Sequence, residues 1–206
     1  MKGILVFGES TSFGRGDNEN GGWSGRLKRY FESKDYYNVV YNLGVPGQSS
    51  TDLLERFDIE AKARTKKIWP NDEFTIIFAI GTNDSKGLDT PDNVKTPLDK
   101  FKKNILTLID ESKKFTDKIV FIGLIPVNED ITNPYENTYF FNERTKQYNE
   151  VIKNCCKDNN ILFIDMFDDW FKSDYKTLLG DGVHPNSKGY EKIFLKVKET
   201  LFSNLQ

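Results

Sequence analysis

Short runs of apolar residues recur along the chain, and each has an uninterrupted apolar centre rather than an alternation of apolar and polar positions. A continuous apolar run of this length is typical of a strand that is covered on both faces, as in a parallel sheet. Five such runs predict strands, at residues 3–7, 38–42, 73–80, 118–124 and 161–164.

Longer segments with apolar residues at intervals of three and four separate and follow these runs, which is the spacing of a helix with one buried face. They predict helices at residues 23–33, 51–65, 97–115, 137–158 and 187–202. In the third of these helices, Ile105, Leu108 and Ile109 lie on one face, and we expect that face to contact the sheet.

Strands that alternate with helices favour an α/β fold, because right-handed crossovers then join parallel strands and place helices on both faces of the sheet. We therefore expect a three-layer α/β/α sandwich with a flavodoxin-like five-stranded parallel sheet. The length of 206 residues is that of one ordinary domain. Since no repeat or low-complexity linker interrupts the pattern, we assign residues 1–206 to a single domain.

Two stretches, residues 84–96 and 166–182, show no clear period and are richer in Asp, Gly and Pro. They predict loops, and long loops at the edge of such a sheet shape the site. The aromatic residues between 167 and 175 leave two interpretations open, a wall or lid over an acyl pocket and core packing beneath a loop. Trp23 likewise either packs the first helix onto the sheet or lines the site.

His184 is the only histidine in the chain, so any proton transfer through imidazole must use it. Asp181 precedes it by three positions, with Gly182 between them and Pro185 directly after, which favours a tight loop. In such a loop the carboxylate can hold one ring nitrogen and leave the other to accept a proton. Ser10 is the strongest candidate nucleophile because it follows the first predicted strand, and open α/β sheets bind ligands beyond the carboxyl ends of their strands.

Two further strand exits carry groups suited to the same chemistry. Gly44 follows the second predicted strand and Asn83 follows the third. A tetrahedral intermediate of acyl transfer needs neutral donors for its negative oxygen, and backbone N–H groups and an asparagine amide meet that need. The sequence therefore predicts acyl transfer with Ser10 as nucleophile, His184 as base, Asp181 as its partner, and the donors of Ser10, Gly44 and Asn83 as the oxyanion hole. Taken alone, Ser10 is more typical of a helix cap or a turn than of a nucleophile.

Charge and composition exclude several other classes. The 29 basic and 31 acidic residues are interspersed, with a net charge of −2, so we expect no nucleic-acid partner. The first apolar run is too short for a signal peptide and none approaches the length of a membrane span. We expect a cytoplasmic protein without stable membrane insertion, a trimmed upstream signal peptide being the alternative.

The residues that commonly hold metals and cofactors lack the necessary spacing. Cys155 and Cys156 are adjacent, and with a single histidine they form no zinc pattern. We expect both cysteines to be free thiols. The glycines at positions 14, 16, 21 and 22 fail the spacing of nucleotide-binding loops. The sequence thus predicts a protein without a metal and without a cofactor.

Four short segments carry these groups, around Ser10, Gly44 and Asn83 and from Asp181 to His184. Together they resemble the SGNH hydrolase superfamily, also called the GDSL esterases and lipases. They occur in the order typical of that family, from Gly8 to Asn186, and so span almost the whole chain. The resemblance implies the same roles as above. Ser10 is the implied nucleophile, and Gly44 and Asn83 are the implied oxyanion donors. Asp181 and His184 are the implied remaining members of the triad.

Two positions beside Ser10 depart from the family pattern. Glu9 stands before the serine where the family usually has aspartate, and Thr11 follows in place of the leucine of the namesake motif. A carboxylate that is longer by one methylene must sit differently beside Ser10. We expect activity to survive this change.

The expected function is therefore a serine ester hydrolase that cleaves small or short-acyl carboxylic esters through an acyl-enzyme intermediate, with O-acetylated sugars among the implied substrates. Two alternatives remain open. One is a lysophospholipase or acyl-thioesterase with a longer acyl groove, and the other is a non-catalytic carbohydrate- or lipid-binding module, for which the altered residue Glu9 is the motive. The expected partner is a small-molecule ester, and the sequence leaves the oligomeric state open.

Overall fold

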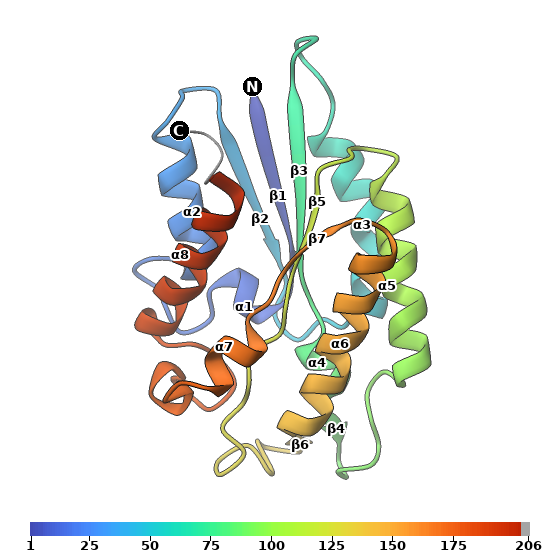
Figure 1. Ribbon diagram of the computed structural model, residues 1–206, viewed down its shortest axis with the longest axis vertical. Helices are drawn as coiled ribbons and strands as arrows, with labels where there is room; N and C mark the ends of the chain where they lie inside the picture. Colours follow the sequence, from blue (N-terminus) through green and yellow to red (C-terminus); the bar gives the residue numbers. More distant parts are fainter. Residues whose placement is uncertain (203–206) are drawn as a thin grey trace.

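A computed structural model describes residues 1–202 of the protein, and its centre is a five-stranded parallel sheet. The strand order is β2-β1-β3-β5-β7 (Figure 1). The strands are β1 (Lys2–Gly8), β2 (Val39–Gly44), β3 (Glu73–Ala79), β5 (Ile119–Ile122) and β7 (Leu162–Ile164). All five predicted strands are confirmed, and the order is that of the flavodoxin-like fold.

Helices cover both faces of this sheet, which confirms the three-layer α/β/α sandwich (Figure 1). On one face lie α2 (Gly22–Glu32) and α8 (Ser187–Phe202). On the other lie α3 (Ser50–Arg64), α5 (Leu98–Ser112) and α6 (Asn142–Asp158). Within residues 1–202, no helix combines the length and apolar character needed to cross a bilayer.

The central strand β1 shows how one short run serves two hydrophobic cores. Successive strand side chains point to opposite faces, so Leu5 packs with the layer of α3, α5 and α6 while Ile4 packs with the layer of α2 and α8. Both side chains are almost completely buried. Burial of an aliphatic side chain of this size contributes about 2 kcal/mol relative to an exposed position, which is why continuous apolar character is required along the whole run.

The helix faces agree with the predicted period. Ile105, Leu108 and Ile109 of α5 are fully buried in the core beneath the sheet, as predicted. Cys155 and Cys156 of α6 are free thiols, also as predicted, and both are buried. Burial raises the pKa of the Cys156 thiol to about 12, so this sulfur stays protonated and unreactive at neutral pH.

The predicted start of the fourth helix is wrong, since α6 begins at Asn142 rather than at residue 137. The intervening residues instead contain β6 (Thr138–Tyr139), which pairs antiparallel with β4 (Gly87–Leu88) outside the main sheet. The Asn142 side chain accepts a hydrogen bond from the N–H of Val127 at 2.8 Å and donates one to the Val127 carbonyl at 2.9 Å. These two bonds hold the first residue of the helix against the chain that leaves β5.

The two predicted loops contain short helical and strand elements that lack a sequence period. They are α4 (Thr82–Ser85), β4, α7 (Phe167–Phe171) and the 3-10 turn η1 (Tyr175–Leu178). Phe167 and Trp170 are buried, Trp170 in the same core as α8, so core packing describes these two aromatic side chains. Phe171 is 51% exposed and its ring stacks between those of Phe167 and Tyr175.

Arg26 of α2 connects the segment after the first strand with the last helix. Its guanidinium pairs with Asp17, donates to Glu191 at 2.7 Å through Nε, and donates to the Ser187 hydroxyl at 2.8 Å. Arg26 and Asp17 are both buried. Because Ser187 begins α8, three residues after His184, this ion pair ties the segment that follows Ser10 to the segment that follows the histidine.

We expect Arg26→Met to lower the free energy of unfolding by about 3 kcal/mol or more, because a buried aspartate without its cation is strongly destabilising. Urea denaturation followed by circular dichroism measures the loss. Arg26→Met combined with Asp17→Asn should lose less than the single variant, since no uncompensated charge is then buried.

Lys28→Met is the matched control, because Lys28 lies on the same helix and pairs with Glu32 at the surface. An exposed pair of this kind contributes at most about 1 kcal/mol. Equal losses for Arg26→Met and Lys28→Met would contradict the role assigned to the buried pair.

Candidate active site

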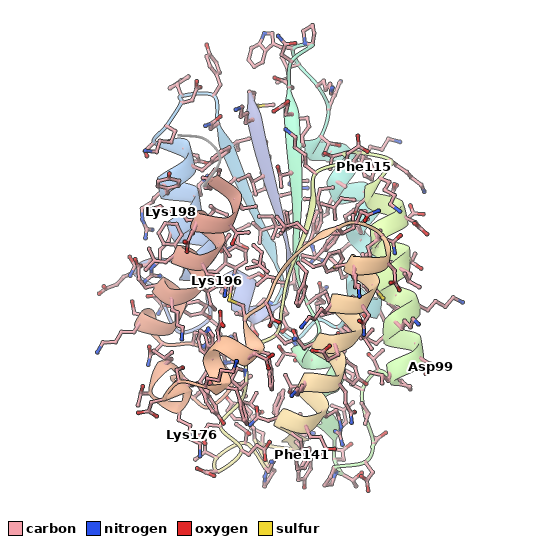
Figure 2. All side chains as sticks on the ribbon, in the orientation of Figure 1. Asp99, Phe115, Phe141, Lys176, Lys196 and Lys198 are labelled. Atoms are coloured by element: carbon pink, nitrogen blue, oxygen red, sulfur yellow. The ribbon has the colours of Figure 1, made fainter. Side chains whose placement is uncertain are left out.

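The carboxyl ends of β1, β2 and β3 meet at one edge of the sheet, and the loops that follow them gather there (Figure 1). Figure 2 marks this end of the molecule by Phe141 and Lys176, whereas Phe115 lies toward the opposite end. The last pairs of the sheet are Gly8 with Gly44 and Gly8 with Ala79. The three strands therefore deliver their next residues to the same place.

Ser10 is the first residue of α1 (Ser10–Phe13), a single helical turn that starts directly after β1 and Glu9. The sharp reversal from strand to helix requires glycine at position 8. A Cβ there would lie 2.2 Å from Ser12 Oγ and 2.4 Å from the Ala79 carbonyl oxygen, which is closer than any real contact. The glycine thus lets the strand turn and leaves the Ser10 hydroxyl at the edge of the sheet.

The structure brings Ser10, His184 and Asp181 together in one chain of hydrogen bonds. His184 Nε2 lies 2.8 Å from Ser10 Oγ, and His184 Nδ1 lies 2.7 Å from Asp181 Oδ2. The other carboxylate oxygen, Oδ1, accepts the backbone N–H groups of Val183 at 3.0 Å and of His184 at 2.7 Å. Gly182 has a φ of +90°, a left-handed conformation that favours glycine and lets the loop fold back on Asp181.

The charge on Asp181 is favoured by its donors. Burial opposes ionisation, but the hydrogen bond from the His184 ring and the two backbone N–H groups together hold the pKa of the Asp181 carboxyl well below its usual range. An ionised carboxylate at Nδ1 fixes the tautomer in which Nε2 carries no proton. That nitrogen can then accept the proton of Ser10.

The three predicted oxyanion donors reach the same edge, but two of them already have acceptors within the protein. The Gly44 N–H donates to Asn42 Oδ1 at 3.0 Å. Asn83 Nδ2 donates to Glu9 Oε2 at 2.5 Å and to the Gln48 carbonyl at 3.1 Å. The N–H of Ser10 lies in the first turn of α1, where amide groups have no acceptor inside the helix. A substrate oxygen that binds the Gly44 N–H or the Asn83 amide would have to share these donors with their present acceptors or replace those acceptors.

Gly44 packs directly against the turn that carries Ser10. A Cβ at position 44 would lie 2.4 Å from the Phe13 nitrogen and 2.9 Å from the Glu9 carbonyl oxygen. Both contacts are with backbone atoms, which cannot move aside without displacing α1. Glycine is therefore required here for close approach, in addition to any role of its N–H.

Glu9, which departs from the family pattern, lies inside the site with its carboxylate buried. Its Oε2 accepts both the backbone N–H of Asn83 at 3.1 Å and the Asn83 side-chain amide. Burial raises the pKa of the Glu9 carboxyl, the Thr82 hydroxyl and the Asn83 N–H groups lower it, and the nearby charge of Asp84 raises it further. The longer side chain thus reaches across to hold Asn83 in place.

Sequence reasoning identified Glu9 only as a departure and missed three groups that contact the site. The Tyr135 hydroxyl donates a hydrogen bond to Asp181 Oδ2 at 3.2 Å. The Gln48 carbonyl accepts a hydrogen bond from the Asn83 amide, and the Asn42 side chain accepts one from the Gly44 N–H. Asn42 lies two residues before Gly44, and an asparagine there was a usable signal. Tyr135 and the Gln48 backbone carry no local signal, because their contacts come from distant segments.

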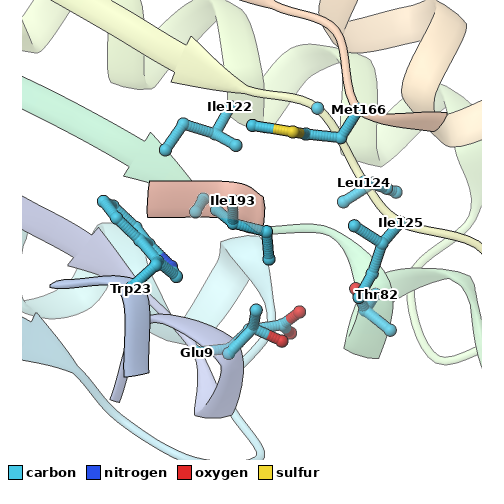
Figure 3. Close-up of a pocket in the computed structure, with 11 residues that line it drawn as sticks. Glu9, Trp23, Thr82, Ile122, Leu124, Ile125, Met166 and Ile193 are labelled. Atoms are coloured by element: carbon cyan, nitrogen blue, oxygen red, sulfur yellow. The ribbon is translucent and has the colours of Figure 1, made fainter. Parts of the chain in front are cut away.

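A small cavity of about 20 Å³ lies beside the turn that carries Ser10 (Figure 3). Glu9 and Thr82 give it a polar wall, while Trp23, Met166 and Ile193 give it an apolar one (Figure 3). Its volume suits one water-sized group. Trp23 is fully buried and packs α2 onto the sheet, as one of the two interpretations predicted, and its side chain also borders this cavity.

No group of three or more histidine, cysteine, aspartate or glutamate side chains within residues 1–202 is arranged to hold a metal ion.

A parallel α/β/α sandwich with a serine, a histidine and an aspartate linked at the carboxyl edge of its sheet is the arrangement of hydrolases that act through a serine. The chain belongs to the GDSL-like lipase/acylhydrolase family, whose sequence model matches residues 6–192. It is a carboxylic ester hydrolase by this membership.

Solved structures share the fold over nearly the whole chain. A lipase/acylhydrolase from Enterococcus faecalis has a TM-score of 0.78 at 20% identity, covering 98% of this chain and 96% of that one. The acetyl xylan esterase AlAXEase has a TM-score of 0.76 at 20% identity, covering 97% and 99%. An acetylxylan esterase from Geobacillus stearothermophilus has a TM-score of 0.72 at 18% identity, covering 96% and 92%. A sequence search among curated proteins finds no match.

We expect Glu9→Ala to lower kcat about tenfold or more with little change in KM, because the Asn83 backbone N–H loses its buried acceptor and the side-chain amide loses its anchor. Glu9→Gln keeps an acceptor oxygen of the same reach and should stay within a few-fold of the wild type. Steady-state kinetics with p-nitrophenyl acetate measure both constants.

Glu19→Ala serves as the control, because Glu19 is an exposed carboxylate in the segment after α1. It should leave kcat unchanged. A Glu9→Ala protein that folds and turns over at the wild-type rate would show that Asn83 needs no such anchor.

Proposed function

We propose that the protein hydrolyses small or short-acyl carboxylic esters through an acyl-enzyme formed on Ser10. The observation that carries this proposal is the pair of short contacts from the His184 ring, 2.8 Å to Ser10 Oγ and 2.7 Å to Asp181 Oδ2. Nucleophile, base and the partner of the base are thus within hydrogen-bonding distance before any substrate binds.

In the first half of the reaction, Ser10 Oγ attacks the carbonyl carbon of the ester while His184 Nε2 takes the hydroxyl proton. The carbonyl electron pair moves onto oxygen and then re-forms the double bond, which breaks the bond to the alcohol. The alcohol leaves with the proton that His184 held. In the second half, water attacks the acyl-enzyme by the same route, and the acid is released as Ser10 regains its proton.

The developing negative charge on the carbonyl oxygen is stabilised in this mechanism by the N–H groups of Ser10 and Gly44 and by the Asn83 amide. The Gly44 N–H and the Asn83 amide reach this oxygen by sharing or exchanging acceptors that they hold before the substrate binds, such as Asn42 Oδ1 and the Gln48 carbonyl. The Ser10 N–H has no acceptor inside α1 and can donate directly.

Acetylated sugars are the substrate class that we favour. Two of the structures compared above are acetyl xylan esterases that share the fold along the whole chain. A fold hosts many specificities, so the substrate must be established by assay.

A longer acyl chain is the second candidate, and exposed apolar side chains beside the site favour it. Phe13, on the same turn as Ser10, is 50% exposed, and Ile131, beside Gly182, is 53% exposed. Val45, which follows Gly44, is also exposed. Apolar side chains at the mouth of a site can bind an alkyl chain.

A fluorophosphonate probe should label the native protein at Ser10, as located by mass spectrometry, and Ser10→Ala should abolish both labelling and ester hydrolysis without loss of folding. His184→Ala should lower kcat on the order of 10³-fold or more, by analogy with other triads. A folded wild-type protein that neither reacts with the probe nor hydrolyses esters would favour the binding-module alternative.

The two substrate classes differ in chain-length dependence. For a short-acyl esterase, kcat/KM for p-nitrophenyl esters should fall by about tenfold or more between acetate and octanoate, because the long chain finds no groove. A flat or rising series would favour the longer-acyl alternative. In that case Phe13→Ala should weaken octanoate hydrolysis selectively and leave acetate hydrolysis unchanged.

A further inference from the structure

Tyr135 contacts the acid–base pair from a segment that the mechanism does not use. Its hydroxyl donates to Asp181 Oδ2 at 3.2 Å, the same oxygen that accepts from His184 Nδ1 at 2.7 Å. The other carboxylate oxygen is held by backbone N–H groups alone. Tyr135 is therefore the side chain outside the loop of Asp181 that shares the oxygen on which the orientation of His184 depends.

Residues 123–141, the excursion between β5 and α6, hold this tyrosine against the loop of Asp181. The N–H of Asn128 donates to the Gly182 carbonyl at 2.8 Å. The side chains of Ile131 and Thr132 lie so close to Gly182 that a Cβ there would contact both at 2.8 Å. One backbone hydrogen bond and two side chains thus hold this segment against the loop of Asp181 at Gly182.

The Tyr135 ring is oriented by packing. It lies edge-to-face on Phe140, with centroids 6.5 Å apart and an interplanar angle of 81°. It also packs against a small buried cluster that contains Phe140, Val127 and Val183, the last of which directly precedes His184. These contacts lie on the ring, and its hydroxyl meets Asp181.

The charges around Tyr135 keep its hydroxyl a donor. Burial raises the pKa of the Tyr135 hydroxyl, and the charges of Asp181 and Glu136 raise it further, against a small opposing effect of Arg15. Burial and the charge of Asp181 also raise the pKa of the Tyr190 hydroxyl in α8. Asp181 itself has 38% of its side chain exposed, so water competes for its oxygens and a fixed donor matters.

We propose that Tyr135 is a positioning residue, which holds the Asp181 carboxylate in the orientation that aligns His184 with Ser10 and draws part of the carboxylate charge away from the imidazole. The proposal rests on the proposed function for its kinetic consequence, whereas its effect on His184 is independent of turnover. The arrangement extends the hydrogen-bonded chain to four side chains, from Tyr135 through Asp181 and His184 to Ser10.

Tyr135→Phe removes only the hydroxyl and keeps the ring. We expect kcat to fall about fivefold with KM unchanged, the size typical of one lost hydrogen bond of ordinary strength. With less of its charge drawn away, Asp181 stabilises the protonated imidazole more strongly, so the acidic limb of the pH–rate profile should move to higher pH. Tyr139→Phe, which removes a hydroxyl four residues along the same excursion, should change neither quantity.

Because His184 is the only histidine, its ring protons can be followed without ambiguity in a proton NMR titration of the uninhibited protein. The titration midpoint should lie at higher pH in Tyr135→Phe than in the wild type, and Tyr139→Phe should match the wild type. This readout stands even if no ester is hydrolysed, so failure of the proposed function and failure of the present proposal are distinguishable.

The pair is tested directly by a double-mutant cycle. In an Asp181→Asn background, Tyr135→Phe should have no further effect on kcat or on the His184 titration, because the charge that the hydroxyl binds is gone. Equal effects of Tyr135→Phe with and without Asp181, or a single variant whose titration and kcat match the wild type, would overturn the proposal.

Discussion

The contact between His184 Nε2 and Ser10 Oγ joins residues that are 174 positions apart, and the proposed reaction depends on it. No local preference can form such a contact. It exists because parallel strands all end at one edge of the sheet, so β1 and the later crossovers bring their loops to a common place. The buried pair of Arg26 and Asp17 then ties the segment after Ser10 to the start of α8, and so to the loop of His184.

Three carboxylates lie at the site, and each has different hydrogen-bond partners and therefore a different structural role. Asp181 is held ionised by the His184 ring and by backbone N–H groups. Glu9 anchors Asn83 from a buried position. Asp84 accepts the N–H and the hydroxyl of Ser50, the first residue of α3, and burial raises its pKa. The acidic groups therefore serve the site by holding N–H and O–H donors in fixed directions, and only Asp181 touches the imidazole.

Membership of the family establishes ester hydrolysis, and the solved structures show how far the fold is shared. Structures of about 20% identity superimpose over nearly the whole chain, so the sandwich tolerates replacement of most of its sequence. Such tolerance follows from a core that needs apolar volume more than particular residues. Phe13 at the end of α1, Val45 after β2 and Ile131 between β5 and α6 are exposed apolar side chains outside this core. The choice between short and longer acyl chains under the proposed function depends on side chains of this kind.

The sequence by itself determined the layers, the five strands, most helix bounds and the set of chemical groups at the strand exits, because apolar period and turn residues are local properties. It did not determine that α6 starts at Asn142, nor the pairing of β4 with β6, because those depend on Val127 and on a partner strand some fifty residues away. Likewise, the hydroxyl of Tyr135, the carbonyl of Gln48 and the reach of Glu9 gain their meaning only from what they contact. A hydrogen bond between distant segments has no period in the sequence, and only the packing of one segment on another decides it.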